Sequence, residues 1–188
     1  MKKQYLNRES GIWTLEAAKK RHRFDKQLAH VIGRAYKPAL VADVGCGNGA
    51  YCKFLSEEYG WKIHGYEGTQ DIASLGIYDD IMILDLSVRR YVDIPYDLVI
   101  CLEVGEHIPQ KYEQAFLDNL ADFTTKDLVM SWAVPGQGEF GHFNEQLNGY
   151  IIYWLEKRGL KLDMERSAIL RKYATLKWFK ETLMVFSK

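Results

Sequence analysis

Three glycines stand at a predicted turn between a strand and a helix. Residues 43–49 have the sequence Asp-Val-Gly-Cys-Gly-Asn-Gly. An apolar run over 39–44 precedes them, and a helical pattern follows. Glycines at such a turn let the backbone bend tightly and approach a ligand without obstruction by side chains. The spacing therefore predicts a loop that cradles a cofactor through Gly45, Cys46, Gly47 and Gly49.

A carboxylate at the start of this loop narrows the choice of ligand. Gly45-x-Gly47-x-x-Ala50 also satisfies the fingerprint of dinucleotide-binding proteins, so the glycines alone leave a nicotinamide cofactor open. Asp43 lies at the end of the predicted strand, where its charge attracts an ammonium group and repels a pyrophosphate. We therefore favour a cofactor that carries an amino-acid ammonium.

A second carboxylate ends the next apolar run, in His64-Gly65-Tyr66-Glu67-Gly68. Its distance from the glycines is close to the offset of roughly 20 residues at which an acidic residue binds ribose hydroxyls. We expect Glu67 and Gly68 to contact the cofactor, with Glu67 on the ribose. The alternative for Glu67 is a solvated carboxylate in a turn.

The order of an acidic residue and Gly-x-Gly-x-Gly in residues 43–49 resembles the first motif of class I S-adenosylmethionine-dependent methyltransferases. The resemblance covers roughly residues 39–188 and implies S-adenosyl-L-methionine as the cofactor, with S-adenosyl-L-homocysteine as its product. It further implies that Asp85 accepts a hydrogen bond from the adenine amino group and that Leu86 packs on the ring. Asp85 as a helix cap or turn residue is the alternative.

A second signature follows the fourth apolar run. Residues 103–109 resemble the Glu-x-x-Glu-His-x-Pro signature of small-molecule and sugar methyltransferases. Glu103 leaves its strand at the carboxyl end, where open α/β sheets bind ligands, so we place it in the cofactor site. For His107, both a proton acceptor and a structural contact beside the adenine remain open.

The stronger candidate for a general base is His142, in a glycine-rich loop over 132–145. Imidazole titrates near neutral pH and can take a proton from a hydroxyl as the methyl group transfers. The alternative is a histidine that bonds the Asn144 backbone or caps the next helix. As the resemblance implies, the reaction is an in-line displacement at the sulfonium methyl, in which positioning contributes most.

The elements that must position these residues alternate along the chain. Short apolar runs at 39–44, 61–66, 81–84, 96–102 and 128–134 alternate with helical patterns, which predicts a parallel sheet. Helices are expected at 14–36, from Pro109 to 123, and at 147–158. An alternating stretch over 160–164 and an apolar run over 182–186 predict two adjacent closing strands that pair in antiparallel orientation.

These patterns and the resemblance together predict a Rossmann-like class I methyltransferase fold. We expect a mostly parallel seven-stranded sheet with one antiparallel strand and helices on both faces. Residues 1–188 form a single domain, with an N-terminal helical lid segment over 1–37 and a Rossmann-like core over 38–188. Tyr5, Arg8 and Trp13 precede the first helix, so this segment either closes over the cofactor or packs as an ordinary helix.

Composition excludes several classes of protein. The 25 basic and 25 acidic residues provide no field that attracts phosphates, so nucleic acid is not an expected partner. No segment approaches the roughly 18 apolar residues of a membrane span, and no leader is evident, so a cytoplasmic protein is expected. The three cysteines lack a Cys-x-x-Cys pair, and the five histidines have no ligand spacing, so no metal is predicted.

The expected activity is methyl transfer to a small-molecule acceptor, first of all a sugar or glycan hydroxyl. The chain has no Asp/Asn-Pro-Pro-aromatic sequence of adenine amino methyltransferases at the end of its fourth apolar run. Alternatives are N- or O-methylation of another metabolite, an NAD-binding oxidoreductase, and a noncatalytic nucleoside-binding module. The oligomeric state stays open.

Overall fold

A computed structural model describes residues 6–188 of the chain except 92 and 139. Its strands are β1 (Val41–Val44), β2 (Ile63–Glu67), β3 (Ile81–Ile83), β4 (Tyr96–Cys101), β5 (Thr124–Met130), β6 (Lys161–Leu162) and β7 (Met184–Ser187). Its α-helices are α1 (Leu15–Arg21), α2 (Lys26–Ala35), α3 (Ala50–Tyr59), α4 (Glu113–Phe123), α5 (Asn148–Glu156), α6 (Met164–Tyr173) and α7 (Phe179–Thr182). Short 3₁₀ turns are η1 (Ile72–Leu75), η2 (Gly105–His107) and η3 (Gln110–Tyr112).

The strands form one seven-stranded sheet in the order β3-β2-β1-β4-β5-β7-β6. Strands β1 to β5 pair in parallel, whereas β7 is antiparallel to both β5 and β6. This confirms the predicted mostly parallel sheet with one antiparallel strand. The strand order reverses between β1 and β4, and open α/β sheets bind ligands beside the carboxyl ends of the strands at such a point.

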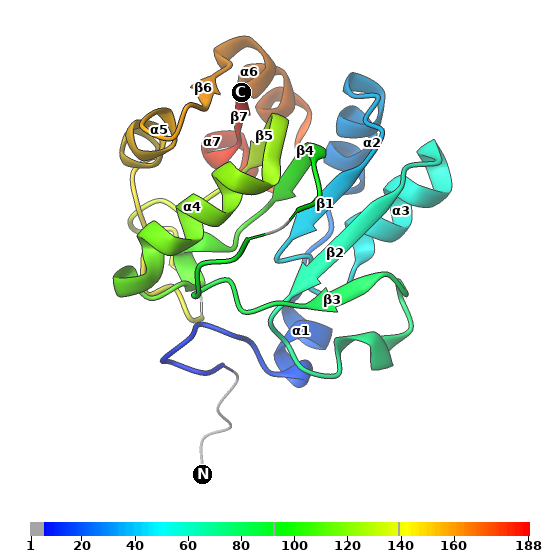
Figure 1. The fold of residues 1–188 in the computed structure, drawn as a ribbon, viewed down its shortest axis with the longest axis vertical. Helices are drawn as coiled ribbons and strands as arrows, with labels where there is room; N and C mark the ends of the chain where they lie inside the picture. Colours follow the sequence, from blue (N-terminus) through cyan, green and yellow to red (C-terminus); the bar gives the residue numbers. More distant parts are fainter. Residues whose placement is uncertain (1–5, 92, 139) are drawn as a thin grey trace.

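Helices cover both faces of the sheet (Figure 1). Alternate residues of a strand point to opposite faces, so Val44 packs with α4 and α5 while Val41 packs with α2, α3 and α6. Helix α1 and the described residues before it, 6–14, lie instead at the end of the sheet where the parallel strands finish (Figure 1). In the part of the chain that the structure describes, no helix combines the length and apolarity that crossing a membrane requires.

The predicted helix over 14–36 is wrong, because α1 and α2 are separated at 22–25. Asp25 caps α2 by accepting from the Leu28 N–H, and its other oxygen accepts from the N–H groups of Thr175 and Leu176. A cap held to a distant loop prevents a continuous helix. Because α2 is packed in the core, only those described residues of the 1–37 segment that precede α2 lie at the ligand end of the sheet (Figure 1). Tyr5 lies outside the described residues.

Several boundaries also differ from expectation, and β5 ends at Met130 and β7 begins at Met184, not at 134 and 182. Strand β5 begins at Thr124, not at 128, because α4 runs directly into it and the Thr124 hydroxyl donates to the Leu120 carbonyl. Pro109 precedes the turn η3, so it is not the first residue of α4. Met164 begins α6 where an alternating strand was expected, because the Asp163 side chain caps that helix through the Arg166 N–H.

Candidate active site

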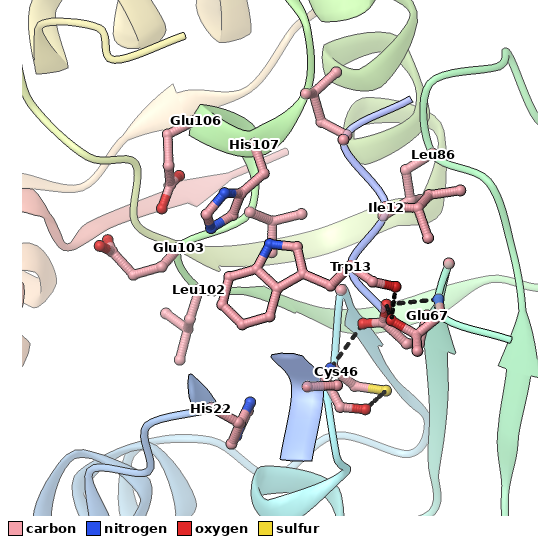
Figure 2. Close-up of a pocket in the computed structure, with 18 of the residues that line it drawn as sticks. Ile12, Trp13, His22, Cys46, Glu67, Leu86, Leu102, Glu103, Glu106 and His107 are labelled. Carbon is pink, nitrogen blue, oxygen red and sulfur yellow. Dashed lines mark hydrogen bonds between the residues drawn. The ribbon is translucent and has the colours of Figure 1, made fainter. Parts of the chain in front are cut away.

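A cavity of about 210 Å³ opens at the carboxyl ends of the parallel strands. Its wall combines the loops after β1, β2, β3, β4 and β5 with the segment from Ser10 to Trp13. Figure 2 shows Glu103, Glu106 and His107 at one end, Glu67 and Cys46 at the other, and Trp13 between them. Of the site residues expected from the sequence, only Gly49 does not line this cavity. The others line it: Asp43, Gly45, Cys46, Gly47, Glu67, Gly68, Asp85, Leu86, Glu103, His107 and His142.

The glycine loop has a backbone that other residues would strain. Gly45 has a φ of +75°, and a Cβ there would lie 2.4 Å from the Val104 side chain. Gly47 has a φ of +56°, and its Cβ would lie 2.3 Å from His22 Nδ1. Gly49 caps α3 in the left-handed conformation and does not line the cavity. Two of the three glycines therefore keep the cavity wall bare, while the third starts the helix.

Glu67 holds this loop from the neighbouring strand. Its Oε2 accepts from the Gly47 N–H at 3.0 Å, and its Oε1 accepts from the Thr69 N–H at 2.9 Å and the Thr69 hydroxyl at 2.8 Å. The carboxylate thus occupies a donor that a bound pyrophosphate would need. Oε1 thus accepts two bonds, whereas Oε2 accepts one and can accept a further bond from a ligand hydroxyl.

Asp43 lies beneath the loop and is only 4% exposed. Burial, with a smaller effect from the negative charge of Glu67, raises its pKa to about 7, although the Cys52 thiol donates to the carboxylate at 3.2 Å. A carboxyl group poised in this way is driven into its charged form by a cation in the cavity. This electrostatic state suits an ammonium ligand.

Asp85 has a local role in addition to its place in the cavity wall. Its Oδ1 accepts from the Ser87 N–H at 2.9 Å and from the Ser87 hydroxyl at 2.6 Å. This is an Asx turn, the alternative that the sequence left open. Oδ1 is thereby engaged, and the adenine contact stays a prediction.

At the other end of the cavity, Glu103 has a φ of +54°, which is uncommon for a residue other than glycine. Its N–H donates to the Ser131 hydroxyl, and its Oε2 accepts from Gln137 Nε2 at 2.6 Å. Burial raises the pKa of this carboxyl against those hydrogen bonds. A strained residue that is fixed on both sides at a strand end is typical of functional sites.

The two histidines face each other across this end, with ring centroids 5.1 Å apart. His107 Nδ1 lies 3.0 Å from the Gly141 carbonyl oxygen, so Nδ1 donates and Nε2 keeps its lone pair. Burial lowers the pKa of His107 to about 4 in spite of that bond, so the ring is neutral at pH 7. His142 Nδ1 lies 2.9 Å from Glu145 Oε1, which orients the ring. The structure thus brings together two histidines from separate loops.

Glu106 lies beside them and is 0% exposed. Neither of its carboxylate oxygens has a hydrogen-bond partner of good geometry among the described residues, and only the backbone N–H groups of Glu106 and Ala133 approach the carboxyl and favour its charge. Burial and the nearby Glu103 raise the pKa of Glu106 well above its usual value. The sequence signature contains Glu106, but residue type alone assigned it no role.

Other wall residues come from segments that no motif marks. Trp13 bridges the two ends, because its carbonyl accepts from the Thr69 hydroxyl at 3.1 Å and its indole packs edge-on against His107 at 4.9 Å. The wall also includes His22, Tyr51, Gln137, Trp178 and Phe179. Of these residues, only Trp13, by its position before the first helix, and Gln137, by its place in the loop over 132–145, lie in segments that the sequence placed near the site. Arg8, its companion in that prediction, is exposed and does not line it.

Comparison with known proteins identifies the class of this fold. No protein-family model matches the chain. The probable chloroplastic tocopherol O-methyltransferase of Oryza sativa subsp. japonica is 33% identical over 109 residues, which cover 51% of this chain and 30% of that protein. The chain therefore matches less than a third of that relative's length.

Solved structures match over most of the chain. The sugar N-methyltransferase KedS8 of Streptoalloteichus sp. has a TM-score of 0.69 at 13% identity and covers 90% of both chains. The N-methyltransferase NodS of Bradyrhizobium japonicum, solved with S-adenosyl-L-homocysteine, has a TM-score of 0.64 at 15% identity and covers 86% of this chain and 84% of NodS. The chain has the Rossmann-like class I methyltransferase fold. Over about half its length it is also similar in sequence to a methyltransferase.

Proposed function

We propose that the protein binds S-adenosyl-L-methionine and transfers its methyl group to a small-molecule acceptor. The observation that carries this proposal is the set of groups at the ends of β1 and β2. Asp43 offers a buried carboxylate to the ammonium, and Glu67 offers its Oε2 to the ribose diol beside a bare glycine loop. NodS, which has a similar fold, was solved with the product of this cofactor.

The same groups oppose a nicotinamide dinucleotide. In dinucleotide-binding proteins the glycine N–H groups face a pyrophosphate. Here the Gly47 N–H donates to the Glu67 carboxylate, and Asp43 adds a second acid below the loop. A pyrophosphate would displace one carboxylate and meet the charge of the other.

We further propose a sugar or glycan hydroxyl as the acceptor. The Glu103 to Pro109 signature supports it, as does the absence of an adenine amino methyltransferase motif. KedS8, of similar fold, is a sugar N-methyltransferase, and the rice relative is an O-methyltransferase. Glu106, His107 and His142 lie next to the donor pocket, and Glu103, which the sequence placed in the cofactor site, lies with them (Figure 2). Of these, His142 is the candidate proton acceptor, because Glu145 orients its ring.

The first experiment is a calorimetric titration with S-adenosyl-L-homocysteine, alongside NADH. We expect micromolar binding of the former and no heat from the latter. Binding of NADH alone would overturn the proposal. Transfer of a labelled methyl group from the donor to a panel of sugars, with matched amines as competitors, then tests the acceptor. Labelling of amines only would replace the hydroxyl with a nitrogen acceptor.

A further inference from the structure

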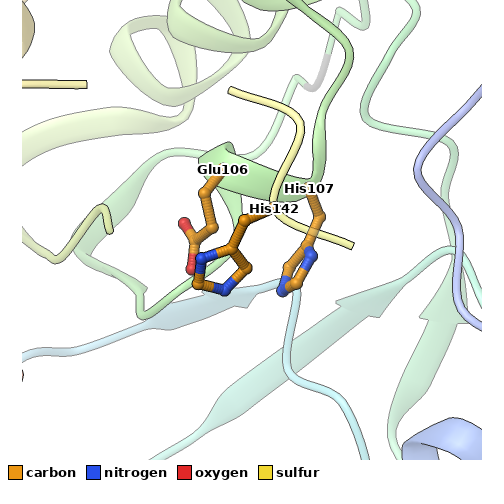
Figure 3. Close-up of side chains that lie close together, drawn as sticks. All are labelled: Glu106, His107 and His142. Carbon is orange, nitrogen blue, oxygen red and sulfur yellow. The ribbon is translucent and has the colours of Figure 1, made fainter. Parts of the chain in front are cut away.

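Three potential metal ligands converge at the end of the cavity away from the glycine loop. Glu106 and His107 belong to the turn η2 after β4, and His142 belongs to the loop after β5 (Figure 3). One ligand atom from each lies within 4.8 Å of the others. No sequence motif contains this cluster, because its third member, His142, belongs to a separate loop.

The two histidines are held as metal-binding histidines usually are. Such residues donate their remote ring N–H to a backbone carbonyl or a carboxylate, which orients the ring and sets its tautomer. His107 bonds the Gly141 carbonyl through Nδ1, and His142 bonds the Glu145 carboxylate through Nδ1. Both rings are therefore left with Nε2 as the available ligand atom.

The state of Glu106 is the second, independent observation. A fully buried carboxyl without a hydrogen-bond donor is costly, and buried polar groups nearly always have a partner. Both Glu106 oxygens lack a partner of good geometry among the described residues, and the approach of the Glu106 and Ala133 N–H groups does not offset its burial and the negative charges of Glu103 and Glu145. A cation supplies what is missing, because it bonds the oxygens and offsets the charge of all three acids.

We propose that Glu106, His107 and His142 bind a divalent transition-metal ion beside the donor pocket. Two imidazole nitrogens and a carboxylate oxygen suit zinc, iron or manganese better than calcium. Three ligand atoms about 2.0 to 2.2 Å from one ion lie roughly 3.3 to 3.8 Å from one another in a tetrahedral or trigonal site. The three groups, whose ligand atoms now lie within 4.8 Å of one another, therefore reach a common ion after side-chain shifts of up to about 1 Å.

Three protein ligands leave coordination positions open. Resting on the proposed methyl transfer, we assign an open position to the oxygen of the acceptor hydroxyl. His142 is then a ligand and not the proton acceptor. The two roles differ in what they require of Glu106, since a base at His142 does not need its negative charge and a metal site does.

The test is a titration of tag-free full-length protein with Co²⁺, followed by visible absorption and calorimetry. Cobalt serves as the probe because its bands report coordination by nitrogen and oxygen. The variants are Glu106→Gln, His107→Gln and His142→Gln. The matched control is His30→Gln, since His30 lies on α2 and its ring bonds Tyr59. Titration of every sample with S-adenosyl-L-homocysteine shows, independently of cobalt binding, whether the protein is folded and its donor site is intact.

We expect one Co²⁺ per chain in the wild type and in His30→Gln, and binding at least about tenfold weaker in each of the three cluster variants. Donor binding stays unchanged throughout. Absence of Co²⁺ binding by the wild type, or equal binding by all variants, would overturn the metal site. Failure of the wild type to bind S-adenosyl-L-homocysteine would overturn the proposed function, whereas the cobalt titration would still test the metal site.

Discussion

The carboxylates at the two ends of the cavity differ in the hydrogen-bond donors that they have. At the glycine-loop end, Glu67 accepts from two backbone N–H groups and a hydroxyl, and Asp43 accepts from a thiol. At the histidine end, Glu106 has no hydrogen-bond partner of good geometry among the described residues, and Glu103 accepts from the side chains of Gln137 and Thr182. Backbone N–H groups orient the Glu67 carboxylate at the glycine-loop end. At the histidine end, side chains surround Glu106, whose carboxyl lacks well-placed hydrogen-bond donors. We infer that the first binds the donor and the second the acceptor.

The largest expected effect falls on turnover at the histidine end. His142→Ala should lower kcat by roughly 10²- to 10⁴-fold, whether the ring takes a proton or binds a metal ion. Affinity for S-adenosyl-L-homocysteine should stay within error, because the other end is unchanged. Labelled methyl transfer and calorimetry on the same preparations measure both quantities. His30→Ala is the control, and an equal loss of donor affinity in His142→Ala would break the division between the two ends.

At the glycine-loop end, Glu67→Ala should weaken donor binding by about 1.5 to 3 kcal/mol, the range for hydrogen bonds to charged groups. The reason is the loss of the ribose contact together with the support of the Gly47 N–H. Calorimetry measures the change. Glu57→Ala removes an exposed carboxylate from α3 and should change nothing. An unaltered affinity in Glu67→Ala would remove Glu67 from the donor site.

The same contrast between the two ends explains how much of the candidate site could be predicted from the sequence. The strands, the sheet and the glycine-loop end were predictable because backbone-built sites leave contiguous motifs, such as 43–49 and Glu67 at the end of the next strand. The histidine end was only partly predictable, since Glu106 acquires its significance from burial and from His142 on another loop. The break between α1 and α2 depends on Asp25 meeting Thr175, a contact that no local pattern encodes.

A smaller effect concerns the charge of Asp43. Its pKa of about 7 in the free protein should fall when an ammonium binds, so binding releases a proton. Donor affinity should therefore rise with pH, by nearly tenfold per unit below about 7, and level off above it. Titration between about pH 5.5 and 8 in buffers of different ionisation heat measures both slope and proton release. Asp43→Asn should bind weakly with a flat profile, and a steep profile in that variant would assign the titration to another group.

The smallest effect tests what joins the two ends. Trp13 touches both, through the Thr69 hydroxyl at the glycine-loop end and the His107 ring at the other. Trp13→Ala keeps the backbone carbonyl and removes the ring contact, so the loss is expected mainly at His107. An aromatic pair contributes about 0.5 to 1.5 kcal/mol beyond buried area, which predicts an acceptor KM raised roughly 2- to 13-fold. Trp13→Phe should restore most of it. A larger loss of donor affinity than of acceptor KM would show that Trp13 belongs to the donor site.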